Sequence, residues 1–303
     1  MLDVLIVGSG PAGLSAAIYA KRANLKVCVA EKEYLGTGQI AESHQVDNYP
    51  GFNGVSGYEL GELFRGHAVK MGVDFYQGEA TDFEHLPDGW RVWFDNGDMI
   101  MAKCIIYCAG AVHRRLLVPG EKEFSGRGVS YCAVCDGAFY KGKKAAVIGG
   151  GDTALNDALY LAEICEKIYL VHRRKEFRGS MQTLEKIKQR ENIEIITGAQ
   201  VVEILGERKA DALLLDQGQK LPVEGVFVAI GMVPQTESLK GIVALDESGY
   251  VEADETGKTS AEDFFAAGDV RRKQLRQVVT AVSDGANAAA SAAKNIRNFS
   301  IDK

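Results

Sequence analysis

Two stretches of this chain show the same order of apolar, glycine-rich and helical positions. The first runs from the apolar residues 4–7 through a glycine-rich turn at 8–13 and a helical pattern of small residues to a second apolar run at 26–30. The second repeats this order over residues 144–171. Short apolar runs joined by a glycine turn and a helical period are typical of a strand–turn–helix–strand unit. The chain is therefore predicted to be an α/β protein with two Rossmann-like (βαβ) dinucleotide-binding domains.

The remaining pattern predicts further elements between and after these two units. They are a helix after Ser56 that ends near Met71, alternating strands over 79–101, a buried strand at 104–107, strand-rich sequence over 193–229, an apolar strand at 263–267 and a long alanine-rich helix from about Gln277 to Asn298. Pro119-Gly120 and Pro234 bracket the second unit, and such residues are typical of linkers.

Composition limits the function classes. A length of 303 residues suggests about two domains. The net charge of −6 lacks the basic excess that nucleic-acid binding needs. The longest uncharged stretch, between Asp3 and Lys21, is interrupted by glycines and proline, so neither a membrane span nor a signal peptide is expected. Six cysteines are too few for a secreted disulfide scaffold, which favours a reducing, cytoplasmic location.

The glycines of each turn have separate expected roles. In the first copy, Gly8 makes the tight turn, Gly10 lets the backbone approach a pyrophosphate, and Gly13 allows close helix–strand packing. The amides at the start of the following helix supply partial positive charge. Ordinary packing is the alternative explanation for such glycines. The strand before each turn and the helix after it favour nucleotide binding.

The residues that end the second strand of each unit differ in charge. Glu31 follows Gly8 by 23 residues, and a carboxylate there accepts hydrogen bonds from ribose hydroxyls. His172, at the same distance from Gly149, is followed by Arg173 and Arg174, with Arg178 close behind. Guanidinium groups suit a ribose 2′-phosphate, although a solvated basic face is the alternative. One site is thus expected to take FAD or NAD, and the other NADPH.

The apolar strand near the C-terminus ends in Gly268-Asp269, and this favours FAD for the first site. An aspartate at the start of a helix can hold a ribityl hydroxyl, while helix N-terminal amides near Arg276-Gln277 face a flavin ring. A simple helix-capping role is the alternative for Asp269. Two dinucleotides in one chain suggest that a hydride passes between them.

Cys132 and Cys135 form a C-x-x-C motif that is followed by Asp136. Such a motif is either a redox disulfide or half of a zinc site. Zinc needs two more close ligands, but Cys104 and Cys108 lie on a predicted strand, where their Cα atoms would be roughly 13 Å apart. The sequence therefore favours a redox disulfide and no metal. Asp136 is then a candidate proton donor, or the cap of a helix that the cysteines begin.

The chain resembles the low-molecular-weight thioredoxin reductases of the bacterial type. The motifs that carry the resemblance, in chain order, are G-S-G-P-A-G, Gly38-Gln39, Asp47-Asn48-Tyr49-Pro50-Gly51, Ala109-Gly110-Ala111, Y-C-A-V-C-D-G, G-G-G-D-T-A, H-R-R-K-E-F-R and A-A-G-D-V with R-Q-V-V-T. They cover essentially the whole chain, and their combination in this order is highly specific.

This resemblance implies a homodimeric enzyme that reduces thioredoxin or a similar small disulfide protein. It places an FAD domain at 1–114 and 243–303, with an inserted NADPH domain at 115–242. It implies that Cys135 faces the flavin, that Cys132 attacks the protein substrate and that Asp136 is the acid. The residues implied for FAD are Gly8, Ser9, Gly10, Pro11, Ala12, Gly13, Glu31, Lys32, Gly38, Gln39, Asn48, Ala109, Gly110, Asp269, Arg276, Gln277 and Val278. Those implied for NADPH are Gly149, Gly151, Asp152, Thr153, Ala154, His172, Arg173, Arg174 and Arg178.

Three positions depart from the pattern of this family. Residues 41–44 replace a threonine-rich stretch beside the flavin, Thr37 stands where a second glycine is usual, and Asn156 stands where glutamate is usual. The first two bear on flavin contacts, and the third bears on domain docking.

Three other functions compete with that of an NADPH-dependent disulfide reductase. A flavin-dependent dithiol oxidase would share the cysteine pair but would not need the arginines after His172, and a reductase with another electron donor would have eroded nucleotide motifs. A non-enzymatic redox sensor would not need two complete cofactor sites.

Because nicotinamide and disulfide both have to reach one flavin ring, two domain orientations are expected, with hinges near Pro119-Gly120 and Gly231–Pro234.

Overall fold

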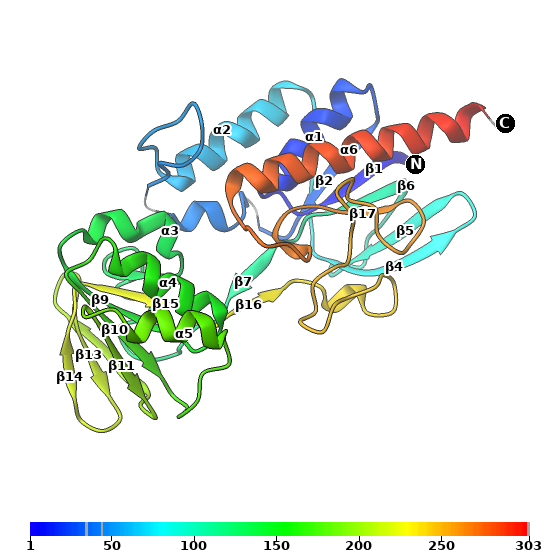
Figure 1. Ribbon diagram of the computed structural model, residues 1–303. Helices are drawn as coiled ribbons and strands as arrows, with labels where there is room; N and C mark the ends of the chain where they lie inside the picture. The colour runs from blue at the N-terminus through cyan, green and yellow to red at the C-terminus, as the bar shows by residue number, and fades with distance from the viewer. Residues whose placement is uncertain (34–35, 44, 302–303) are drawn as a thin grey trace. The chain divides into compact units, whose positions relative to one another are not determined.

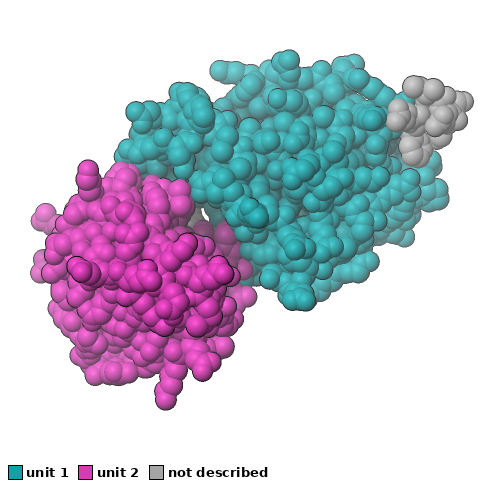
Figure 2. All heavy atoms as spheres, in the orientation of Figure 1, with its two compact units in different colours: residues 1–112, 233–303 teal, residues 113–232 magenta. Residues whose placement is uncertain are grey.

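The computed structural model describes residues 1–33, 36–43 and 45–301. The chain forms two compact units: unit 1 comprises residues 1–112 and 233–303, and unit 2 comprises residues 113–232 (Figure 2). Each unit has its own sheets and its own buried clusters. The second unit is thus inserted into the first, an arrangement that the family resemblance implies and that the α/β pattern alone does not require.

Unit 1 is built around a mixed sheet in the order β3-β2-β1-β6-β5-β4, with β17 paired to β6. Its strands are β1 (Leu2–Val7), β2 (Val27–Glu31), β3 (Asp74–Gln77), β4 (Ala80–Leu86), β5 (Gly89–Phe94), β6 (Met99–Tyr107) and β17 (Phe264–Ala266). The pairs among β1, β2, β3, β6 and β17 are parallel, and β4 and β5 form an antiparallel edge. The central parallel strands β1, β2 and β17 are largely buried on both faces, as their apolar sequence predicts, whereas the edge strand β3 is partly exposed.

Three helices flank this sheet: α1 (Pro11–Arg22), α2 (Gly57–Lys70) and α6 (Val278–Ile301). Figure 1 shows α1, near the N-terminus, lying beside α6, near the C-terminus. Small residues allow this approach, because a Cβ atom on Gly285 would lie 2.0 Å from the backbone oxygen of Ala12. The helix α2 begins where the sequence predicts, since the Ser56 side chain accepts a hydrogen bond from the backbone N of Glu59.

Unit 2 contains a wholly parallel sheet in the order β11-β10-β9-β15-β8. Its strands are β8 (Val129–Ser130), β9 (Lys144–Ile148), β10 (Lys167–His172), β11 (Ile193–Thr197) and β15 (Gly225–Val228). A separate antiparallel sheet consists of β12 (Val201–Gly206), β13 (Ala210–Leu215) and β14 (Lys220–Pro222). The helices are α3 (Ala133–Asp136), α4 (Asp152–Ala162) and α5 (Met181–Lys188).

Short elements complete the two units. The 3₁₀ helices are η1 (Gln39–Glu42), η2 (Gly137–Tyr140), η3 (Glu237–Leu239) and η4 (Gly268–Val270). The strands β7 (Ala111–His113) and β16 (Met232–Pro234) pair with each other where the chain passes from one unit to the other. Neither of these two strands, nor α5, was identified from the sequence, because each is too short to show a clear period.

The unit boundaries lie before the positions expected from the sequence. Residues 233–242 pack in unit 1, where Leu239 is fully buried and the Tyr107 hydroxyl donates a hydrogen bond to the backbone oxygen of Gln235 at 2.8 Å. Pro119-Gly120 is not a linker. The Pro119 oxygen accepts a hydrogen bond from the Ile204 backbone N at 3.0 Å, so this segment is packed against β12 inside unit 2.

None of the helices in the described ranges combines the length with the apolar character that a bilayer-spanning segment requires. The same residues contain no group of three or more histidine, cysteine or acidic side chains arranged to hold a metal ion.

Candidate functional site

The first glycine turn has the geometry that its sequence predicts. Gly8 has φ +102°, in the region that favours glycine. A Cβ atom on Gly13 would lie 1.9 Å from the Gly8 oxygen, so α1 packs against the turn too closely for any side chain. At Gly10 the nearest protein atom would be 3.7 Å from such a Cβ. This middle position therefore leaves room for a ligand to approach the start of α1.

Glu31 is fixed at the mouth of this turn. Its Oε2 accepts hydrogen bonds from the backbone N and the hydroxyl of Ser9, at 2.9 and 2.8 Å, and its Oε1 accepts one from the backbone N of Glu33 at 3.1 Å. A carboxylate has about four acceptor positions, and three are used here, so one position on Oε1 remains for a ribose hydroxyl. The neighbouring Lys32 is exposed and forms an ion pair with Glu79 at 3.8 Å.

Asp269 carries a buried carboxylate oxygen that fits a ligand donor. Its Oδ1 is buried, and within the described part of the chain it has no hydrogen-bond partner. Burial raises the pKa of this carboxyl, whereas the positive charges of Lys273 and Arg276 lower it. A buried acceptor without a partner costs free energy unless a ligand donates to it. Asp269 follows Gly268 in η4, the position from which the sequence predicts a contact with a ribityl hydroxyl.

A buried charge cluster lies behind Asp269. Asp284 of α6 forms ion pairs with Arg271 at 3.0 Å and with Lys273 at 2.8 Å, and its Oδ2 accepts a hydrogen bond from the backbone N of Gly268 at 3.0 Å. All three charged side chains are at most 12% exposed. The cluster therefore fixes the turn that carries Asp269. The sequence analysis did not identify it, because neither Arg271, Lys273 nor Asp284 belongs to a local motif.

Two predicted residues far apart in the sequence meet in unit 1. The Asn48 amide donates a hydrogen bond to Oε1 of Gln277 at 2.9 Å, across a separation of 229 residues. The Arg276 guanidinium lies over the Tyr250 ring, 4.2 Å from its centroid. The backbone N of Gln277 donates to the Thr280 hydroxyl at 3.1 Å, so this amide is already capped.

The other predicted residues of unit 1 lie around these. Gly38 has φ +75°, and a Cβ on it would lie 2.9 Å from the Gly10 Cα. Pro11 and Ala12 begin α1, Gln39 begins η1, Ala109 and Gly110 follow β6, and Val278 begins α6. Which of these residues contacts a cofactor stays a prediction.

The departures from the family pattern lie in three places, two near η1 or α2 and one on α4. Thr37 is buried, and its side chain packs closely against α2. A Cβ atom added to Gly61 would lie 2.6 Å from the Thr37 Oγ1. Ala41 and Ser43 lie at η1, whereas His44 and the Glu42 side chain lie outside the described residues. Asn156 is exposed on α4.

The second glycine turn, in unit 2, is open at its middle glycine. A Cβ on Gly149 would lie 2.2 Å from the Ala229 oxygen, whereas one on Gly151 would meet no protein atom within 4 Å. Ala154, which takes the place of a third glycine, is fully buried against the turn. Asp152 and Thr153 form the exposed first turn of α4. Open space at Gly151 is what a closely bound phosphate requires.

The segment after β10 folds back onto this turn. The backbone N of Arg178 donates to the Gly150 oxygen at 2.7 Å, and the backbone N of Ser180 donates to Oδ1 of Asp152 at 2.7 Å. The His172 ring is 5% exposed and stacks on Phe177 with 5.0 Å between centroids. Burial and nearby arginines lower the pKa of His172, so it is neutral at pH 7 and supports the loop by packing.

Three arginines of this segment present unpaired charges. Arg173, Arg174 and Arg178 are exposed, and no carboxylate of the described ranges forms an ion pair with any of them. Surface arginines commonly have acidic neighbours, so three unpaired guanidinium groups beside an open glycine turn fit a phosphate-bearing ligand.

Cys132 and Cys135 form a disulfide, with 5.3 Å between their Cα atoms. Cys132 is the N-cap of the short helix α3, and its Sγ accepts a hydrogen bond from the backbone N of Cys135 at 3.2 Å. Both cysteines are half-buried, beside the exposed side chains of Val134 and Phe139. An accessible disulfide with a short loop is suited to thiol–disulfide exchange.

Asp136 is held beside this disulfide. Its Oδ2 accepts a hydrogen bond from the Ser130 hydroxyl at 2.6 Å, and the Ser130 Oγ also accepts one from the backbone N of Cys132 at 3.1 Å. Asp136 does not cap the start of α3, because Cys132 occupies that position. The sequence analysis did not select Ser130, since a serine two residues before the first cysteine carries no motif of its own.

The remaining cysteines are structural. Cys28, Cys104, Cys108 and Cys165 are buried and unpaired, and burial raises the pKa of each thiol. A buried thiol with a raised pKa is unreactive, so these four cysteines act as small apolar side chains.

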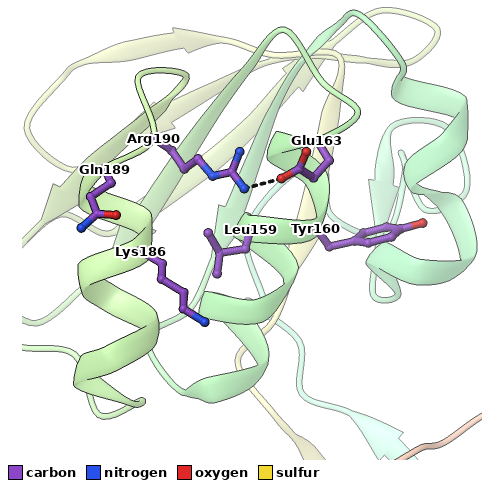
Figure 3. A pocket seen from close by; sticks show the side chains of 6 residues that line it. All are labelled: Leu159, Tyr160, Glu163, Lys186, Gln189 and Arg190. Atoms are coloured by element: carbon purple, nitrogen blue, oxygen red, sulfur yellow. Dashed lines mark hydrogen bonds and ion pairs between the residues drawn. The ribbon is translucent and has the colours of Figure 1, made fainter.

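Two shallow cavities lie away from both glycine turns. One, of about 600 Å³, lies between α4 and α5 and is lined by Leu159, Tyr160, Glu163, Lys186, Gln189 and Arg190 (Figure 3). At 1.5 Å per residue, its α4 side lies roughly 10 Å or more along the helix from the turn. The other, of about 510 Å³, is lined by residues 47–53, which include Asn48. Only the second overlaps the predicted cofactor residues.

Two nucleotide-type turns and an accessible disulfide define, by fold and site, a nucleotide-dependent dithiol–disulfide oxidoreductase. Residues 2–285 match the family model for pyridine nucleotide-disulphide oxidoreductases, and the chain belongs to this family. FAD and NADPH are the cofactors of the family, in agreement with the predicted pair.

Several of the proteins similar to this chain are named thioredoxin reductase. The thioredoxin reductase of Bacillus subtilis is 40% identical over 95% of this chain and 93% of its own length. That of Listeria monocytogenes is 38% identical over 98% and 94%. The crystal structure of thioredoxin reductase from Streptococcus pyogenes matches with a TM-score of 0.94 and 37% identity, over 99% of both chains.

Proposed function

We propose that the protein is an NADPH-dependent thioredoxin reductase that reduces a small disulfide protein through Cys132 and Cys135. The observation that carries the proposal is the half-buried disulfide on the same unit as the arginine-flanked glycine turn. Similarity to thioredoxin reductases over nearly the whole chain supports thioredoxin as the partner. The dithiol oxidase alternative is disfavoured, because it gives no reason for three unpaired arginines after β10.

Unit 1 is proposed to hold FAD, at residues 1–112 and 233–303. Glu31 would accept from the adenosine ribose, the open position at Gly10 would admit the pyrophosphate, and the unpaired Oδ1 of Asp269 would accept from a ribityl hydroxyl. These residues fit the group, since the buried acceptor of Asp269 gains a donor only when a ligand is bound. When both cofactors are bound, they supply the electron pair that cleaves the disulfide.

Unit 2 is proposed to hold NADPH. Gly151 leaves space for the pyrophosphate, and Arg173, Arg174 and Arg178 would bind the 2′-phosphate. Replacing Arg173 and Arg174 with Ala should therefore raise the KM for NADPH by about tenfold or more and change the KM for NADH by less than twofold. Lys186→Ala, a charge removed from the cavity of Figure 3, is the matched control. Equal effects on the two nucleotides would contradict this assignment.

In the proposed exchange, the Cys132 thiolate attacks one sulfur of the partner disulfide and Cys135 then attacks Cys132. The partner gains two electrons and two protons, and the disulfide of residues 132 and 135 re-forms. Asp136, which is fixed beside the pair, would move the protons between sulfurs. The exposed Val134 and Phe139 would be covered by the partner.

Turnover is proposed to require a change in the orientation of unit 2. Both the nicotinamide and the disulfide would be carried by unit 2, and each must come within roughly 3–3.5 Å of one flavin ring. The expected hinges are the segments at the unit boundaries, 112/113 and 232/233. A reducible cross-link between the units should permit one half-reaction and abolish turnover. Full turnover in the cross-linked protein would rule out the scheme.

A homodimer in the cytoplasm is the proposed physiological form. Tyr58, Leu63 and Val69 of α2 are large apolar side chains that are about half exposed, and contact with a second subunit would cover them. The sparse cysteines, four of them free and buried, support a reducing compartment. Light scattering coupled to gel filtration tests the dimer, and a monomer at micromolar concentration would contradict it.

A spectroscopic titration tests the proposed function as a whole. The purified protein should be yellow, lose its visible absorbance when NADPH is added, and regain it when oxidised thioredoxin is supplied. Cys132→Ser and Cys135→Ser should retain bleaching by NADPH but lose reduction of thioredoxin. A colourless protein, or one that NADPH does not bleach, would disprove the proposal.

A further inference from the structure

A buried serine beside the disulfide makes contacts that the proposed function does not use. Ser130, the last residue of β8, is 5% exposed. Its Oγ lies 2.6 Å from Oδ2 of Asp136, 3.1 Å from the backbone N of Cys132 and 3.3 Å from the Cys132 oxygen. One hydroxyl therefore contacts both the proposed acid and the backbone of the attacking cysteine.

We propose that Ser130 is a positioning residue that holds the Asp136 carboxyl in one place in both of its protonation states. The inference deepens the proposed function and rests on it, since it assumes that Asp136 exchanges protons during thiol–disulfide exchange. Ser130 contacts no substrate sulfur in this proposal and acts only through Asp136.

The hydrogen-bond inventory of a hydroxyl makes this arrangement possible. A serine hydroxyl has one hydrogen and two acceptor lone pairs. When Asp136 is ionised, the Ser130 hydrogen points to Oδ2 and one lone pair accepts from the Cys132 amide. When Asp136 is protonated, its O–H donates to the second lone pair, and the Ser130 hydrogen turns to the Cys132 oxygen. Each state is satisfied without movement of the carboxyl.

Proton transfer in the exchange passes Asp136 through both states. Carboxylate Asp136 accepts the proton of the Cys132 thiol, and the resulting thiolate forms a bond to one partner sulfur while the partner S–S bond breaks. Protonated Asp136 then donates to the departing partner thiolate. The Cys135 thiol loses its proton to the second partner sulfur as the bond between Cys132 and Cys135 forms. Two electrons and two protons thus move from this dithiol to the partner, and no other reductant is needed.

Other titratable groups lie near Asp136. The Tyr140 phenol of η2 senses the Asp136 charge, but burial is the larger cause that raises its pKa to about 12, so it remains neutral. Asp157 belongs to α4, which packs against α3, and burial raises its pKa to about 6. Because protonation of Asp157 would also appear in a pH profile of the exchange rate, Asp157→Asn is the control for that profile.

Two probe disulfides separate proton donation from other effects of Ser130. The holoprotein is converted to its dithiol form with NADPH and mixed, by stopped flow, with cystamine or with dithionitrobenzoate. The aryl thiolate released by dithionitrobenzoate has a low pKa and leaves without a proton donor, whereas the alkyl thiolate from cystamine needs one. Ser130→Ala should therefore slow exchange with both probes, because each needs the Cys132 proton removed, and should slow cystamine about threefold or more beyond dithionitrobenzoate, because only cystamine also needs a proton donor.

The pH profile and a double variant complete the test. The rate of exchange is measured as a function of pH. In Ser130→Ala, which lacks the hydrogen bond to the carboxylate, the apparent pKa that reports Asp136 should rise by about one unit. Ser130→Thr, which keeps the hydroxyl, should restore both the rate and this apparent pKa. Asp157→Asn should leave the apparent pKa unchanged. Ser130→Ala combined with Asp136→Asn should be no slower than Asp136→Asn alone.

Equal slowing with the two probes would overturn the proposal, as would a double variant slower than Asp136→Asn, because Ser130 would then act on the cysteine directly. These outcomes are distinct from failure of the proposed function, in which NADPH would not generate the dithiol. The dithiol form prepared with dithiothreitol would still test Ser130 in that case.

Discussion

Replacing Asp284 with Asn should strongly destabilise unit 1. The side chain keeps its volume, so no cavity forms, and its amide oxygen can still accept from Gly268. The change removes the negative charge that pairs with Arg271 and Lys273, and it turns the oxygen facing Arg271 into an amide N–H donor. Both cations then remain buried without a carboxylate partner.

The size of the effect follows from the burial of the three side chains. Arg271, Lys273 and Asp284 are 5, 11 and 12% exposed, so solvent screens their charges little. Removing one partner of a buried pair typically costs 3–5 kcal/mol. With a urea m-value of about 2 kcal/mol/M for a unit of this size, the midpoint of unfolding should fall by about 2 M.

Tryptophan fluorescence provides a selective assay, because Trp90 and Trp93 are the only tryptophans of the sequence and both lie on β5 of unit 1. Urea unfolding followed at this signal, at equal flavin content, reports unit 1 without a contribution from unit 2. The matched control is Lys240→Gln, which breaks the exposed pair with Glu237 and should change stability by about 0.5 kcal/mol or less. A midpoint shift below about 0.5 M for Asp284→Asn would refute the reasoning.

Three further predictions concern the glycine turns and a half-buried histidine. Gly13→Ala places a methyl group 1.9 Å from the Gly8 oxygen. The flavin content per chain should therefore fall, and the free energy of unfolding of unit 1 should decrease by about 1–3 kcal/mol. Gly151→Ala meets no protein atom and should weaken NADPH binding while leaving the unfolding curve unchanged; a loss of stability there would contradict the open geometry. Burial, with the charge of Arg115, lowers the pKa of His113 to about 4, against 6.5 when exposed. As pH falls, His113 is therefore protonated in the unfolded chain before it is protonated in the folded one. The free energy of unfolding of unit 2, measured by circular dichroism, should decrease by about 2 kcal/mol between pH 6.5 and pH 4. His113→Phe, which retains the stacking on Tyr131, should flatten this dependence, and an unchanged slope would exclude His113 as its cause.

Local patterns were sufficient for the elements around both nucleotide turns. The strand β9 spans the predicted residues 144–148, and α2 begins after Ser56 as predicted. Strand and helix periods are read within about ten residues, and Gly8 and Gly13 take roles set by backbone sterics that act over a few residues. These features could be predicted because their causes lie within the segment itself.

Short or irregular elements could not be predicted in this way. The strands β7 and β16 have three residues each, and neither shows a period. Proline and glycine at 119–120 suggested a linker, but β12 packs against them and places them inside unit 2. Composition indicates that a turn is present, and only packing decides whether the turn is a hinge.

The sequence by itself determined the α/β class, the two nucleotide turns, the opposite charges at the ends of β2 and β10, and the cysteine pair. Each of these depends on residues that are neighbours along the chain. Only the tertiary structure placed Asp284 between Arg271 and Lys273, joined Asn48 to Gln277 and brought the Ser130 hydroxyl to Asp136. Those contacts join different elements, and their geometry is set by how sheets and helices pack rather than by any local preference of the residues that make them.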